Sequence, residues 1–227
     1  MTNPRINIHI NLTDRTKQNM IQSINTSHIP KLERSVIANV ESEIIIIMSD
    51  ILENDTVYQG LAGEHSSHRK DLMAQFGLIP DSVDDKLYQI KKIFTKSINI
   101  QRRKDKYGLV IIANREQIEN ELITSPIFQY VSYKLNGEST GYLIPWMKWI
   151  VTGEGSAEGF ISFDATNVTS GRSERAIMIP TPGIHWTVSN NVDLGNGNFI
   201  DRILNDPSFK SRAARVIEKE YRRQING

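Results

Sequence analysis

The sequence predicts an α+β fold, with an antiparallel sheet packed against a long N-terminal helix, a central tryptophan-rich helix and a C-terminal helix. Apolar residues recur at helical spacing in three long stretches. Between these stretches lie short alternating segments that end at turn residues, as antiparallel strands do. Runs of helices interspersed with such strands are typical of an α+β domain.

The composition is that of an ordinary globular protein. The 227 residues are 39% hydrophobic and 23% charged, with no cysteine and a net charge of +1. The missing cysteines exclude disulfides and thiolate metal sites and fit assembly in a reducing cytosol. No apolar run is long enough for a membrane helix, and the N-terminus lacks the apolar core of a secretory signal. We expect one domain over residues 28–227, preceded by an extended arm over residues 1–27.

The arm combines a short strand pattern with a polar tail. Ile6, Ile8 and Ile10 alternate with polar residues, and the stretch Thr13–Ser27 carries few large apolar side chains. A segment this polar needs another surface to order it. We therefore expect the arm to add as a strand to an exposed sheet edge of a neighbouring subunit.

Three helices are predicted in the first half of the domain. The first starts near Pro30 and ends at Asn54-Asp55, because its apolar residues follow a helical stripe despite the β-branched run Ile44–Met48. Thr56–Gly63 is predicted to be a turn. Two further helices are expected over His68–Phe76 and from Asp81 or Ser82 to Phe94.

The middle of the chain predicts strands around one short helix. Ile98–Gln101 and Leu109–Ala113 resemble a hairpin joined by the basic turn Arg102–Lys106. A helix over Glu116–Ile123 and a strand from Phe128 to Tyr133 follow. Asn136-Gly137 then marks a tight turn.

Tyr142–Gly155 contains the most apolar helical stretch in the sequence. With only Lys148 and Thr152 suited to water, this helix should be buried. Trp146, Trp149 and the later Trp186 are therefore predicted core residues, with an aromatic ligand pocket as the alternative interpretation.

The last third predicts strands and then two helices. Phe160–Phe163 and Ala176–Ile179 are expected to be strands flanking a projecting polar loop, residues 164–175. Another strand begins at Trp186. The stretch Gly195–Asn198 precedes a helix over Phe199–Leu204, and a final helix starts at Ser208.

No pattern in the sequence indicates an active site. His65 and His68 lie beside Glu64, but a catalytic zinc normally needs three protein ligands, so a polar helix start is the simpler interpretation. Gly153 and Gly155 follow a helix, unlike the glycines of a dinucleotide site. His185 is expected to be packed in the protein. We therefore predict no enzymatic activity, no cofactor and no metal.

Four segments together resemble a pattern in virion structural proteins of tailed bacteriophages. In those proteins an LPWL-WLL-G helix precedes an SR-G-AIM element and a glycine- and asparagine-rich turn into NFI-RA, and an earlier element reads LR-EFGL. The corresponding segments here are DLMAQFGL, IPWMKWIVTGEG, SGRSERAIMI and HWTVSNNVDLGNGNFIDRIL, at Asp71–Leu78, Ile144–Gly155, Ser170–Ile179 and 185–204. Glu174 stands where glycine is common, and Ile203 where alanine is common.

The resemblance implies a structural subunit of the head–tail junction, in a neck or tail-completion ring that joins the portal or connector to the tail. Its partners would be further copies of itself in the ring and neighbouring neck, connector or tail proteins, with sequence-independent DNA contact possible and no membrane. Such a chain would assemble in the host cytoplasm and end in the virion. Arg172, Glu174 and Arg175 of the projecting loop could contact a neighbour, together with the isoleucine row of the arm.

Two alternatives stay open. The first is a sequence-independent nucleic-acid-binding module that uses Arg102–Lys106 and the basic face near Arg212–Arg223, although a solvated surface is the default for both. The second is a metal-dependent hydrolase built on His65, His68 and a distant acid.

Overall fold

A computed structural model describes thirteen stretches of the chain and divides it into two compact units. The stretches are 13, 29–64, 70–76, 78, 80–103, 108–135, 138–143, 145–154, 156–157, 162–164, 177–179, 186–188 and 192–226. Unit 1 comprises Met1–Ile51, Phe94–Arg115 and Ile203–Gly227, and unit 2 comprises Leu52–Ile93 and Glu116–Arg202. The α+β class predicted from the sequence is confirmed, and the described part of the chain is mostly helical.

Helix α2 (Ile29–Glu53) is the long N-terminal helix that the apolar stripe predicts. Its run of four isoleucines shows why helical spacing is the correct interpretation. Ile44 and Ile47 are buried, whereas the side chain of Ile46 is 57% exposed. In a strand Ile44 and Ile46 would share one face, so this burial pattern belongs to a helix.

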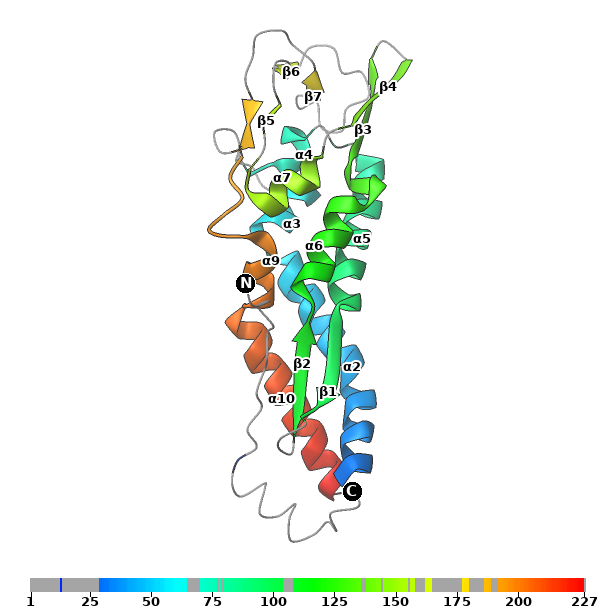
Figure 1. The fold of residues 1–227 in the computed structure, drawn as a ribbon, viewed down its shortest axis with the longest axis vertical. Helices are drawn as coiled ribbons and strands as arrows, with labels where there is room; N and C mark the ends of the chain where they lie inside the picture. Colours follow the sequence, from blue (N-terminus) through cyan, green and yellow to red (C-terminus); the bar gives the residue numbers. More distant parts are fainter. Residues whose placement is uncertain are drawn as a thin grey trace. The chain divides into compact units, whose positions relative to one another are not determined.

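Unit 1 places a two-stranded hairpin against α2 and α10 (Figure 1). Strands β1 (Ile98–Arg102) and β2 (Leu109–Ala113) are antiparallel, with Ile100 opposite Ile111. The predicted hairpin is therefore confirmed. Leu109, Ile111 and Ala113 of β2 are buried, as expected for alternate residues on the face of a sheet that packs on helices.

Helix α10 (Pro207–Asn226) is the predicted final helix, and it begins at a proline. The side chain of Asp206 accepts hydrogen bonds from the backbone N–H of Ser208 at 2.7 Å and of Phe209 at 3.3 Å. This cap satisfies two helix-end donors, and the fixed φ of Pro207 suits the first helical position. Every fourth residue along one face is buried, namely Phe209, Ala213, Ile217 and Tyr221.

A buried carboxylate lies in the core of unit 1. Glu33 of α2 is 2% exposed, accepts a hydrogen bond from Nε of Arg102, and accepts another from the backbone N–H of Gly108 at 3.1 Å. Both donors belong to the hairpin region, so one side chain fixes the hairpin to the helix. Burial and the nearby Glu33 raise the pKa of the Tyr221 hydroxyl on α10.

Four helices in the described part of unit 2 precede the tryptophan helix: α3 (Thr56–Ala62), α4 (Leu72–Gln75), α5 (Pro80–Lys96) and α6 (Arg115–Thr124). The last three residues of α5 and the first residue of α6 belong to unit 1. The predicted turn over Thr56–Gly63 is wrong, because α3 is helical there. A Cβ on Gly60 would lie 2.3 Å from the backbone oxygen of Lys70. This glycine thus permits close approach of the chain near Lys70 and does not end a helix.

The strands of unit 2 form three antiparallel pairs. They are β3–β4 (Tyr130–Leu135 with Glu138–Leu143), β5–β8 (Ser156–Ala157 with Trp186–Thr187) and β6–β7 (Ser162–Asp164 with Ile177–Ile179). β6 and β7 are the predicted strands that flank the projecting loop. Two assignments are wrong: Phe128 lies in a short 3-10 helix, η1 (Pro126–Phe128), and Tyr142 lies in β4, ahead of the tryptophan helix.

Helix α7 (Trp146–Thr152) is the tryptophan helix, and it is buried as predicted. Trp146, Met147, Ile150 and Val151 are at most 1% exposed, and Trp149 is 9% exposed. Pro145 is the N-cap of the helix, and Gly153 ends it with a φ of 70°. A helix of only seven residues is too short to be stable alone, so packing of its apolar surface must hold it.

Candidate functional site

Aromatic side chains from three elements meet around α7. The ring centroids of Phe76 and Trp146 are 6.0 Å apart, and those of Phe76 and Trp149 are 6.4 Å apart. Phe128 meets Trp146 edge-on, with centroids at 5.8 Å and an interplanar angle of 86°. Such pairs contribute about 0.5–1.5 kcal/mol each beyond the area that they bury. The element Asp71–Leu78 is thereby packed onto the tryptophan helix.

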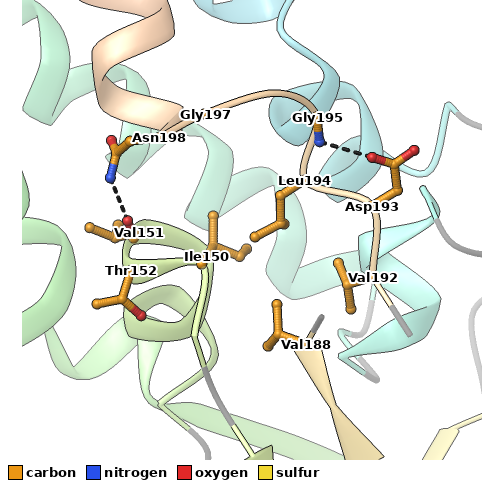
Figure 2. Close-up of a pocket in the computed structure, with 11 residues that line it drawn as sticks. Ile150, Val151, Thr152, Val188, Val192, Asp193, Leu194, Gly195, Gly197 and Asn198 are labelled. Atoms are coloured by element: carbon orange, nitrogen blue, oxygen red, sulfur yellow. Dashed lines mark hydrogen bonds between the residues drawn. The ribbon is translucent and has the colours of Figure 1, made fainter. Parts of the chain in front are cut away.

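Asn198 joins the C-terminal end of α7 to the start of α9 (Phe199–Leu204), as Figure 2 shows. Its side-chain oxygen accepts hydrogen bonds from the backbone N–H of Ile200 at 2.9 Å and of Asp201 at 3.2 Å. Its amide nitrogen donates to the carbonyl of Val151 at 2.6 Å. Asn198 therefore caps one helix at its start and satisfies a carbonyl at the end of the other.

Arg202 fixes the glycine-rich turn that precedes α9. Its guanidinium binds Asp55 through two parallel hydrogen bonds, Nε to Oδ2 at 3.0 Å and Nη2 to Oδ1 at 3.1 Å. Nη1 donates to the carbonyls of Asn196 at 3.3 Å and Gly197 at 2.9 Å. Asp55 in turn caps α3 by accepting from the N–H of Val57 at 2.8 Å. A planar five-donor group is needed for so many simultaneous contacts, which a lysine could not make.

The turn itself depends on glycine. Gly195 and Gly197 have φ angles of 77° and 76°, a conformation that other residues adopt only with strain. The side chain of Asp193 accepts from the N–H of Gly195 at 3.0 Å, and Lys70 lies 3.9 Å from the same carboxylate. The sequence predicted a helix start here, but it gave no sign that Asp55 and Arg202 would meet.

A groove of about 500 Å³ opens between the end of α7 and this turn (Figure 2). One side is apolar, with Ile150, Val188, Val192 and Leu194, and the other is backbone-rich, with Gly153, Gly195 and Gly197. Among the described residues that line this groove, Asp193 is the one with an ionisable side chain.

A second hollow, of about 530 Å³, surrounds Tyr58 of α3. Ala62, Met73, Val83 and Leu87 supply its apolar lining, and Glu53, Glu64 and Asp84 supply three carboxylates. Burial, followed by repulsion from Glu53, Asp84 and Glu64, raises the pKa of the Tyr58 hydroxyl to about 12. The hydroxyl therefore stays protonated at neutral pH and can donate a hydrogen bond.

The predicted interface residues cannot be placed. Ile6, Ile8 and Ile10 of the arm, and Arg172, Glu174 and Arg175 of the projecting loop, lie outside the described residues. The same holds for His65, His68, His185 and most of the basic turn Arg102–Lys106. Of the three predicted core tryptophans, Trp146 and Trp149 are buried, whereas the side chain of Trp186 also lies outside the described part.

Trp146 carries a feature that the sequence did not indicate. Its indole N–H is buried and has no hydrogen-bond partner within the described residues. An unsatisfied buried donor costs about 1–3 kcal/mol. The aromatic packing around Trp146 must offset that cost.

Three further searches gave negative results. Among the described residues, no group of three His, Asp or Glu side chains is placed to hold a metal ion. Within the same stretches, no helix combines the length and hydropathy needed to cross a membrane. Comparison of the chain with protein-family models, curated proteins and solved structures found no match.

Proposed function

We propose that this chain is a structural subunit of the bacteriophage head–tail junction, in a neck or tail-completion ring that joins the portal or connector to the tail. The observation that carries the proposal is the meeting of three phage-like segments around one helix. Phe76 of Asp71–Leu78 packs on the tryptophans of α7, and Asn198 of the glycine-rich segment hydrogen-bonds to Val151 at the end of α7.

This convergence supports the resemblance because the segments are far apart in the sequence. Asn198 and Val151 are 47 residues apart, and Phe76 precedes Trp146 by 70 positions. Short chance similarities would have no reason to pack together, whereas elements that build one core would. The segment Ser170–Ile179 contributes only Ile177–Ile179 to the described residues, as strand β7.

The direct test is a cryo-electron microscopy reconstruction of the phage particle that incorporates this chain. The α2, β1–β2 and α10 arrangement of unit 1 and the α7-centred core of unit 2 should each fit density at the junction between head and tail. Absence of the chain from purified virions by mass spectrometry, or density for it elsewhere in the particle, would refute the proposal.

The arm and the projecting loop are the proposed joining elements. Deleting residues 1–27 should leave the two units folded by circular dichroism but reduce the yield of joined particles in a complementation assay. A deletion variant that joins heads to tails as well as the intact chain would refute the role of the arm. The ring-forming role would then depend on other surfaces.

A nucleic-acid-binding module remains the second candidate, because one observation favours it. Arg215, Lys219 and Arg222 are exposed at i, i+4 and i+7 along α10, so they form one basic row. Binding of the intact chain to DNA that weakens steeply with salt would support this function. Equal binding to different DNA sequences is expected in that case.

A further inference from the structure

The hollow around Tyr58, here called the Tyr58 groove, has the make-up of a docking surface. Its lining combines the apolar side chains of Ala62, Met73, Val83 and Leu87 with the carboxylates of Glu53, Glu64 and Asp84. Tyr88, one helical turn after Asp84 on α5, has a side chain that is 60% exposed. Exposed aromatic side chains beside an apolar hollow are typical of protein interfaces.

Two carboxylates of the Tyr58 groove are available to a partner. Glu53 forms an ion pair with Lys91. The side chains of Glu64 and Asp84 are exposed and make no ion pair or hydrogen bond to another described residue. Burial is the main cause of the raised pKa of the Tyr58 hydroxyl, and repulsion from Glu53, Asp84 and Glu64 adds to it, so these three carboxylates lie near one another. The groove therefore favours a cationic occupant with an apolar component.

The chain carries a matching cationic surface on α10. Arg215 and Lys219 are exposed, one helical turn apart, and neither pairs with a carboxylate in the described part of the chain. By contrast, Arg212 pairs with Asp50 at 2.5 Å, and Arg223 pairs with Glu220 at 2.7 Å. Arg215 and Lys219 thus offer two cations one helical turn apart, as many as the two carboxylates, Glu64 and Asp84, that are available at the groove.

We propose that the Tyr58 groove receives helix α10 of a second copy of this chain, with Arg215 and Lys219 facing Glu64 and Asp84. Because the two surfaces differ, a copy that offers its α10 to the next copy keeps its own groove free for another, so a head-to-tail arrangement can repeat from copy to copy. Complementary charge fixes which surface meets which, while the apolar lining and Tyr88 supply the contact area. As a contact within a ring, the proposal rests on the proposed function.

Charge reversal tests this contact, with sedimentation velocity of the full-length chain at low and high salt as the readout. The intact chain should self-associate at low salt and dissociate as salt screens the pairs. Glu64→Arg with Asp84→Arg, and separately Arg215→Glu with Lys219→Glu, should each weaken self-association about tenfold or more. Combining all four substitutions restores the complementary charges and should restore self-association.

Matched controls use exposed charges that lie outside the contact. Asp85→Arg on α5 and Lys210→Glu on α10 should leave self-association within about twofold of the intact chain. Circular dichroism must show that every variant is folded. The proposal is overturned by an intact chain that stays monomeric at low salt, by unchanged association in the reversed variants, or by failure of the fourfold exchange to restore it.

Two further outcomes separate this contact from the functions proposed above. If Arg215→Glu with Lys219→Glu abolishes DNA binding but leaves self-association intact, the row on α10 is a nucleic-acid surface and the groove proposal fails. If reversed variants still occupy the head–tail junction in particle reconstructions, the virion role stands while this contact is excluded. If the charge-reversed variants are missing from the particle and the fourfold variant is present in it again, the result supports both the virion role and the groove contact.

Discussion

Unit 1 and unit 2 each have an apolar core, but the two cores differ in one buried feature. In unit 1 the apolar side chains of α2, β2 and α10 are buried together with one carboxylate, Glu33, which accepts hydrogen bonds from Arg102 and Gly108. In unit 2 the seven-residue helix α7 packs its tryptophans against the rings of Phe76 and Phe128. Unit 1 therefore adds the directional hydrogen bonds of a buried charge to its apolar packing, whereas the core around α7 adds contacts between large aromatic rings.

This difference gives each region its own spectroscopic probe. All three tryptophans of the sequence fall within unit 2, so tryptophan fluorescence reports on that unit. The two longest helices, α2 and α10, fall almost entirely within unit 1 and contribute much of the far-ultraviolet circular dichroism. Substitutions in one unit can therefore be followed separately from their effect on the other.

The largest expected effect is that of Trp146→Ala. Trp146 is fully buried and contacts the rings of Phe76 and Phe128, so its loss should lower the free energy of unfolding by about 3–5 kcal/mol. Urea unfolding followed by the fluorescence of the remaining tryptophans measures this. Lys148→Ala, on the exposed face of the same helix, should change stability by at most about 0.5 kcal/mol. An unchanged midpoint for Trp146→Ala would contradict the packing role.

Glu33→Ala should have the next largest effect, and it should be strongest in unit 1. The substitution leaves the buried N–H of Gly108 without its acceptor and removes the contact with Arg102. Because the side chain of Arg102 is 41% exposed and can turn to water, we expect a loss of about 2 kcal/mol.

Urea unfolding monitored by both circular dichroism and tryptophan fluorescence measures which unit loses stability. Glu41→Ala, an exposed position of the same helix, is the matched control. If the unfolding midpoint measured by fluorescence shifts as far as the midpoint measured by circular dichroism, the two units unfold together and do not have separate stabilities.

The amphipathic helices were predictable from sequence because their signals are local. The stripe through Val36, Val40 and Ile44 has helical spacing, and the structure buries those residues. The β1–β2 hairpin is likewise set by alternation on both sides of a short turn. The prediction was wrong where one residue type is compatible with two structures, as glycine is with a turn and with a closely packed helix. The glycines of Thr56–Gly63 resemble turn residues, but Gly60 sits inside α3, where Lys70 packs against it.

The candidate site was less predictable, because its contacts join residues far apart in the sequence. Arg202 and Asp55 are 147 residues apart, and nothing in either neighbourhood specifies the other. Asn198 can be recognised from the sequence as a candidate N-cap, because it is an asparagine directly before the helical stretch that starts at Phe199. Its bond to Val151 could not be predicted, because it depends on how α7 is packed. The predicted interface residues in the arm and the loop lie outside the described residues and stay predictions.

Asn198→Ala should have a smaller effect than the two core substitutions. It removes a helix cap, which is typically worth about 1 kcal/mol, and the bond to the carbonyl of Val151, so a total loss of about 1–2 kcal/mol is expected. Fluorescence-detected urea unfolding is the measurement. Asn196→Ala is the matched control, since Asn196 accepts a hydrogen bond from Arg202 through its backbone carbonyl, which the substitution keeps. Equal losses for the two variants would mean that the Asn198 side chain has no special role.

The smallest effect is expected for Glu220→Gln, and it should depend on pH. Hydrogen bonds from Arg223, then from Gln224 and Asn39, lower the pKa of Glu220 from 4.5 to about 2 in the folded chain. Because the folded pKa lies below the unfolded one, the stabilisation is fully present above pH 4.5 and is lost as the pH falls towards 2.

Glu220→Gln should therefore lower stability slightly at neutral pH and flatten the loss of stability between pH 4.5 and 2. The free energy of urea unfolding, followed by circular dichroism across this range, measures both effects. Arg222→Gln is a useful control, because Arg222 pairs with Glu218 and not with Glu220. Identical pH profiles for Glu220→Gln and the intact chain would show that this surface cluster makes no measurable contribution to unit 1. A flattened profile would show that the hydrogen bonds of Glu220 to Arg223, Gln224 and Asn39 stabilise unit 1, although single ion pairs near the surface are usually weak.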